Sequence, residues 1–125
     1  MSSPQKLLLV MEAGGYGNLS GALADLGFDV AIENSARRGM NRLKAWQPDV
    51  LVADFYRRYF HDRVSNLESL LAVATRNQNT RIVVIYDPFH AADLALIQQR
   101  HRVDATIALP FAQPALEAAV LGAST

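Results

Sequence analysis

Three carboxylates stand directly after apolar runs of the sequence: Glu12, Asp54 and Asp87. Two carboxylates with water and backbone carbonyls are enough to hold Mg²⁺ weakly. Glu12 and Asp54 are therefore candidate metal ligands, and Asp87 is a third acid for the same pocket. Three adjacent acids would raise a carboxyl pKa unless Arg57 or Arg58 folds back to pair with them. The alternative is that the acids are polar residues at strand ends and bind nothing.

A glycine-rich stretch follows the first apolar run. Gly15, Gly17 and Gly21 lie there, and Glu33 comes about 20 residues on, as in dinucleotide-binding loops. Glycines in this pattern have low specificity, and the chain is too short for a cofactor domain with a catalytic partner. A small nucleotide-binding α/β domain is therefore kept only as a third hypothesis, and a plain loop is the preferred interpretation.

The segment after Asp54 is aromatic and basic. Tyr56, Arg57, Arg58 and Tyr59 belong to residue types that are enriched at protein interfaces. A solvated loop that covers the edge of the sheet is the alternative.

Two further groups of ionisable residues carry weaker signals. One group is the three histidines, which lack the spacing of metal ligands on one helix. The other is a set of basic residues on the second predicted helix, which fit either a solvated helix face or a site for an acidic partner. These residues are His61, His90 and His101, and Arg37, Arg38, Arg42 and Lys44.

Strands and helices are predicted to alternate along the chain. Short apolar runs without helical spacing predict strands buried on both faces, and apolar residues at three- and four-residue steps predict the helices between them. The expected strands cover residues 6–11, 28–32, 50–53, 82–86 and 105–109, and the expected helices cover 19–26, 36–46, 65–76, 90–101 and 114–121. This alternation predicts a doubly wound α/β sandwich with a parallel five-stranded sheet. We expect the strand order 2-1-3-4-5 and a single domain over residues 1–125.

Composition narrows the function classes. Half of the 125 residues are hydrophobic, which suffices for a core, and Lys plus Arg equals Asp plus Glu at 12 each. This balance removes the electrostatic attraction on which nucleic-acid binding depends. The chain has no cysteine, hence no thiolate chemistry, and no apolar run approaches the roughly 18 residues of a membrane span. We expect a cytoplasmic protein that binds neither nucleic acid nor membranes.

The order of these features resembles the receiver domain of two-component response regulators. The order and spacing of the family's second strand, second helix and third strand are matched by VAIENSARRGMNRLKAWQPDVLVADF, in which Asp54 matches the phosphoacceptor. LLLVME, ALADLGFDV and ATIALPF look like the first strand, first helix and fifth strand of the family. The resemblance covers nearly the whole chain and implies a flavodoxin-like fold. It also implies phosphoryl transfer assisted by Mg²⁺, with a hydroxyl and a lysine that bind the product.

Several family positions hold other residues in this chain. Met11 replaces one carboxylate of the acidic pair, which leaves Glu12. Tyr86 stands at the hydroxyl position and is followed by Asp87 where a small residue is usual, so we expect both to crowd the site. Leu109 stands at the lysine position and cannot bind phosphoryl oxygens.

Two other positions complete the comparison. Thr106 stands where the family has a switch aromatic, and Pro110 persists, so the bond from Leu109 to Pro110 is expected to be cis. Arg100 and Arg102 lie on the face of the fourth helix, fifth strand and fifth helix, which receivers commonly use for partners. That face also draws on Asp93, Gln98 and Glu117.

The leading hypothesis is a non-enzymatic degenerate receiver that acts in signal transduction through protein binding, without phosphorylation. No cofactor is then required, although weak Mg²⁺ binding is compatible. The partner would be a kinase, an output domain, another signalling protein or a second copy of the chain. The alternative is a divergent working receiver, phosphorylated on Asp54 by a histidine kinase with Mg²⁺.

Overall fold

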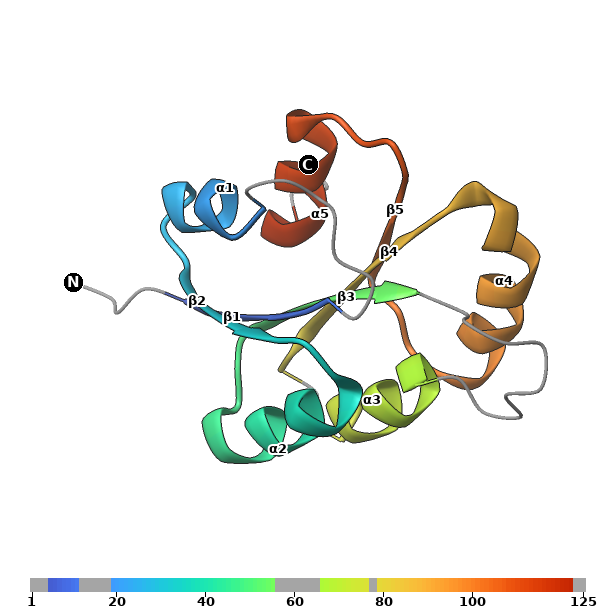
Figure 1. The fold of residues 1–125 in the computed structure, drawn as a ribbon, viewed down its shortest axis with the longest axis horizontal. Helices are drawn as coiled ribbons and strands as arrows, with labels where there is room; N and C mark the ends of the chain where they lie inside the picture. The colour runs from blue at the N-terminus through green and yellow to red at the C-terminus, as the bar shows by residue number, and fades with distance from the viewer. Residues whose placement is uncertain (1–4, 12–18, 56–65, 77–78, 123–125) are drawn as a thin grey trace.

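In the part of the chain that the structure describes, five strands alternate with five α-helices (Figure 1). The computed structural model describes residues 5–11, 19–55, 66–76 and 79–122. Within these residues the strands are β1 (Lys6–Val10), β2 (Asp29–Glu33), β3 (Val50–Phe55), β4 (Arg81–Tyr86) and β5 (Ala105–Ala108). The helices are α1 (Leu19–Asp25), α2 (Ala36–Trp46), α3 (Asn66–Ala74), α4 (Ala91–Arg100) and α5 (Gln113–Leu121).

The five strands form one parallel sheet in the order β2-β1-β3-β4-β5, as predicted. β3 lies at its centre, and all six of its residues are buried. Because each crossover passes through a helix, the helices must cover both faces of the sheet. The predicted α/β class is therefore confirmed.

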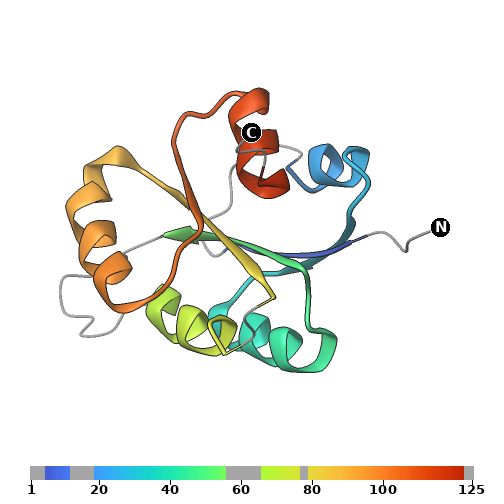
Figure 2. The same ribbon diagram turned by 180° about the vertical axis from the view of Figure 1, so that it is seen from behind.

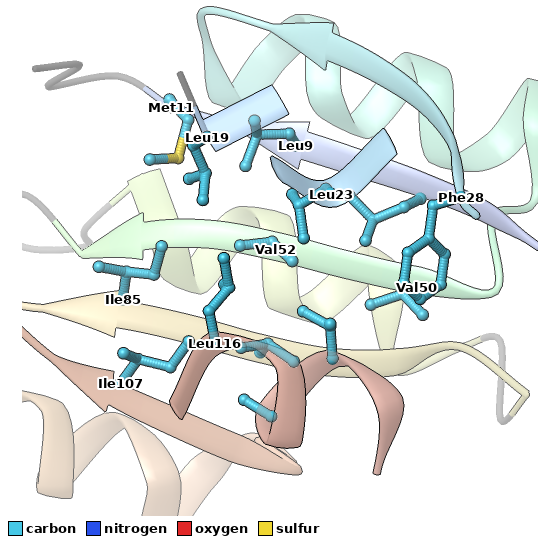
Figure 3. Packing of buried hydrophobic residues seen from close by; sticks show 14 residues of the cluster. Leu9, Met11, Leu19, Leu23, Phe28, Val50, Val52, Ile85, Ile107 and Leu116 are labelled. Carbon is cyan, nitrogen blue, oxygen red and sulfur yellow. The ribbon is translucent and has the colours of Figure 1, made fainter. Parts of the chain in front are cut away.

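Alternating side chains divide the core into two clusters. Leu9 and Val52 point to the face covered by α1 and α5, where Leu23 and Leu116 pack against them (Figure 3). Strand residues of the other parity, such as Leu8, join the cluster with α2, α3 and α4. Figures 1 and 2 show the same division, with α1 and α5 on one side of the sheet and α2 and α3 on the other.

Helix boundaries follow from local capping. The Ser35 side chain accepts a hydrogen bond from the backbone N–H of Arg38, 3.2 Å away, which makes Ser35 the N-cap of α2. The chain leaves helix α1 before Gly27, as the sequence pattern predicts. Gly27 has a φ of +98°, which glycine adopts without steric cost. Residue 65, where the third helix is predicted to begin, lies outside the described residues.

One segment differs from the sequence-based prediction. A single helix is predicted from residue 90, but a short 3₁₀ turn, η1 (Pro88–His90), precedes α4. The Asp87 carboxylate accepts a hydrogen bond from the N–H of Phe89 at 2.9 Å, and Pro88 at the first position of the turn has no N–H to satisfy. The chain therefore turns tightly as it leaves β4.

Helices α3 and α4 are tied by an ion cluster. The buried Glu68 carboxylate lies 3.3 Å from Arg100 and 3.7 Å from the Nε2 atom of His101.

Among the described residues, no helix is long and apolar enough to cross a membrane.

Candidate functional site

Asp54 is the central residue of the candidate site. It lies near the carboxyl end of β3, and only 6% of its surface is exposed. Its side chain shares the sheet face of Val50 and Val52, because residues two apart on a strand point the same way. Asp54 therefore faces the layer formed by α1 and α5.

The residues beside Asp54 on that face are apolar. Strand register pairs Asp54 with Ile85 and Ile85 with Ile107, and the pairing of Val10 with Ala53 carries Met11 alongside Asp54. Met11, Ile85 and Ile107 are all buried in the cluster that Figure 3 shows. Leu109, at the family's lysine position, packs half-buried against the same cluster. Among the described residues, this row therefore consists of thioether and hydrocarbon side chains.

Tyr86 lies away from this row. Its ring packs against the cluster on the α3 and α4 side, together with Phe55, its register partner on β3. This placement corrects the expectation that Tyr86 crowds the phosphoacceptor. The physical reason is the two-residue alternation, which points Tyr86 and Ile85 to opposite faces.

Asp87 is exposed, and its carboxylate is occupied in capping η1. Glu12 lies outside the described residues. Within those residues no cluster of three or more acidic, histidine or cysteine side chains could hold a metal ion. The three-acid pocket and the weak Mg²⁺ site therefore remain predictions.

Other predicted residues are dispersed. Gly21 lies within α1, and Glu33 pairs with Arg42 at 3.0 Å. His90 makes edge contacts with the rings of Phe55 and Phe89. Gly15, Gly17, His61 and the interface candidates Tyr56, Arg57, Arg58 and Tyr59 lie outside the described residues.

The basic residues of α2 share one helix but differ in their contacts. Arg42 stacks over the ring of Trp46, whose centroid is 6.0 Å away, in addition to its pairing with Glu33. Arg37, Arg38 and Lys44 are exposed.

The face near β5 carries the remaining candidates. Thr106 is exposed, and the Leu109–Pro110 bond is cis, as predicted. Arg100 pairs with Glu68, and Arg102 donates a hydrogen bond to the carbonyl of Thr80 and lies 3.5 Å from Asp104. Both arginines thus have roles within the fold.

Sequence reasoning missed one exposed apolar feature. Phe89 in η1 is 88% exposed, and Leu96 on α4 is 53% exposed. The Asp-Pro pair before Phe89 signals a turn that could have indicated its position.

Comparison with known proteins identifies the fold. The chain matches no protein-family model and no curated protein. Among solved structures, it is similar to a response regulator receiver domain protein from Clostridium thermocellum, with TM-score 0.77, 14% identity and coverage of 94% of this chain and 92% of that one. The signal receiver domain of a modulated diguanylate cyclase from Desulfovibrio desulfuricans G20 gives 0.75 at 17% identity, covering 93% and 90%. A response regulator from Desulfuromonas acetoxidans gives 0.70 at 16%, covering 91% of each chain. The chain has the fold of response regulator receiver domains.

Proposed function

We propose that this chain with a receiver fold is a signalling module that acts by binding a protein partner, without a phosphorylation switch. The observation that carries the proposal is the apolar row around Asp54. Met11 and Ile85 are the strand neighbours of Asp54, and Leu109, the residue that matches the lysine of receiver domains by resemblance, packs against the same cluster.

The chemical reason is charge. A phosphoryl group on aspartate brings about two negative charges, which need a divalent cation and a positively charged side chain for stabilisation. Among the described residues, the strand neighbours of Asp54, Met11 and Ile85, supply neither, and burial at Asp54 raises the cost of adding charge there. Asp54 then serves the fold rather than group transfer.

The partner surface in this proposal is formed by η1, α4 and β5. Phe89 and Leu96 supply exposed apolar area, and Thr106 stands there in place of an aromatic switch. Without a bulky ring that moves between two positions, the surface has one conformation, and partner affinity is independent of phosphodonors. The module is proposed to be non-enzymatic and cytoplasmic, and to bind a kinase, an output domain or a second copy of itself.

Intact-mass spectrometry tests the proposal. After incubation with acetyl phosphate and Mg²⁺, the protein should show no stoichiometric mass increase of one phosphoryl group. The matched control is Asp54→Asn, which should give the same spectrum as the unchanged protein. A phosphoryl adduct that is present in the unchanged protein and absent from Asp54→Asn would establish the alternative, a working receiver phosphorylated on Asp54.

A further inference from the structure

The outward side of α2 is strongly basic. This helix of 11 residues carries four basic residues and no acidic one, although the whole chain has 12 of each. Arg37, Asn41 and Lys44 are exposed and lie on one side of the helix, because residues three and four positions apart share a side. Arg38 is exposed beside them. We call these four residues the α2 basic surface.

The fold does not use the basic side chains of this surface. Arg42, which is also on α2, pairs with Glu33 at 3.0 Å. By contrast, the side chains of Arg37, Arg38 and Lys44 form no hydrogen bond or ion pair with any residue that the structure describes. Three neighbouring cations are therefore exposed to solvent, and no carboxylate in this part of the chain compensates their charge.

The two arginines at the start of α2 are unfavourable for the helix itself. Arg37 and Arg38 lie in its first turn, where the helix dipole favours acidic residues over cations. Ser35 is the N-cap, and an acidic residue at position 38 would complete a capping box with it. Arg38 also lies four residues before Arg42, a spacing at which like charges repel. Local stability favours an acid at position 38, so the arginine there indicates a role outside the fold.

We propose that the α2 basic surface binds an acidic segment of a partner protein. The planar guanidinium groups of Arg37 and Arg38 match carboxylates in two-point contacts. Arg37 and Lys44 are seven residues apart, which is roughly 10 Å along a helix axis. In an extended peptide of polyproline II form, side chains three residues apart share a side and are separated by about 9 Å. The segment that fits best therefore has two acidic residues three positions apart.

This surface is separate from the one formed by η1, α4 and β5. Helix α2 packs against α3, at the far end of that layer from α4 (Figures 1 and 2). Binding there does not involve Asp54, so it is independent of whether that residue accepts a phosphoryl group. A protein segment is favoured over a nucleic acid or an anionic membrane because the chain has no formal net charge and hence no long-range attraction for polyanions.

Titration of the full chain with synthetic peptides tests the proposal. The probe is a blocked peptide of sequence Gly-Glu-Glu-Gly-Glu-Glu-Gly, and the control peptide has Gln in place of Glu. Amide NMR signals of Arg37, Arg38, Asn41 and Lys44 should shift saturably with the acidic peptide, more weakly at high salt, and not with the control. Trp46 is the one tryptophan of the chain and lies on α2, so its fluorescence gives a second measurement.

Charge variants make the test specific. Arg38→Glu should weaken binding of the acidic peptide by about tenfold and should also raise the midpoint of thermal unfolding, because it completes the capping box with Ser35. Weaker binding by a more stable protein cannot result from loss of the fold. Arg37→Gln, which removes a charge without reversing it, should weaken binding by about threefold.

Arg76→Glu is the matched control. Arg76 is exposed and follows α3, outside the α2 basic surface, and the substitution changes the net charge as much as Arg38→Glu does. It should alter the affinity by less than about twofold, because salt screens distant charges. Equal weakening by the two glutamate variants, or no saturable shift on α2, would overturn the proposal. So would tighter binding of an oligothymidylate, or of vesicles with equal parts of phosphatidylserine and phosphatidylcholine, than of the acidic peptide.

Discussion

At the scale of single residues, the neighbours of an acid decide its chemistry more than its position does. Asp54 lies near the carboxyl end of an apolar strand, as a phosphoacceptor would, and Met11 and Ile85 lie beside it in the sheet. The replacements at positions 11 and 109 can be read from the sequence by resemblance. The sequence does not show that one row contains Asp54, Ile85 and Ile107, because strand register depends on long-range pairing.

Leu116 provides a residue-scale prediction about the core. It is 0% exposed in the cluster that also contains Met11. Leu116→Ala should lower the free energy of unfolding by about 2–5 kcal/mol, because the deletion leaves a cavity beneath the sheet. Urea denaturation measures this change.

Leu121 is the matched control for that experiment, since it is the same residue type on the same helix and is 53% exposed. Leu121→Ala should change the free energy of unfolding by less than about 0.5 kcal/mol. Equal losses in the two variants would mean that α5 does not bury Leu116 as described.

At the scale of elements, the cap of α2 leads to a second prediction. Ser35→Ala removes the acceptor for the N–H of Arg38 and should destabilise the protein by about 1 kcal/mol. Thermal unfolding monitored by circular dichroism measures the loss. Ser35→Asp retains an acceptor and should be close to the original stability; a loss as large as that of Ser35→Ala would argue against the cap.

Gly39 leads to a third prediction, because α2 lies very close to β1 there. A Cβ atom at position 39 would lie 2.8 Å from the Cγ2 atom of Val10, a stiff side chain in a buried strand. The clash in Gly39→Ala should cost about 1–3 kcal/mol of stability. The gain in helix propensity from glycine to alanine, up to about 1 kcal/mol, offsets only part of this cost, so the variant should be less stable than the original protein.

Asn41→Ala separates these two effects. Asn41 is exposed on the same helix, so the substitution changes propensity without a clash and should be neutral or slightly stabilising in the same urea series. An increase in stability for Gly39→Ala would show that α2 can move away from β1 at little cost.

The elements differ in how well the sequence predicts them. β1, β3 and β4 are the best predicted strands, because their apolar runs are too short for a typical buried helix and fit strands buried on both faces. The sequence predicts one helix from residue 90 and does not predict the separate 3₁₀ turn at Pro88–His90, since helical spacing alone does not distinguish two adjoining helical turns. The pairing of Glu68 with Arg100 joins residues on different helices, and no local pattern marks such a contact.

At the scale of the whole molecule, strand order places two chemically different edges on one sheet. The carboxyl end of β3 presents Asp54 among apolar side chains, and the amino ends of β4 and β5 bring Arg81 close to Arg102. The alternating pattern predicts the first edge, because strand ends can be located in the sequence. The pattern does not predict the second edge, since the two arginines are 21 positions apart in the sequence and only the folded sheet brings them together.

The most direct measurement of the central claim is a backbone amide NMR spectrum recorded with Mg²⁺ and beryllofluoride, a phosphoryl analogue. If the surroundings of Asp54 no longer support a phosphoryl group, signals from β5 and α4 should not shift beyond the effect of Mg²⁺ alone, in the original protein or in Asp54→Asn. Saturable shifts at Thr106 and along α4 that disappear in Asp54→Asn would show a working phosphorylation switch and contradict the account.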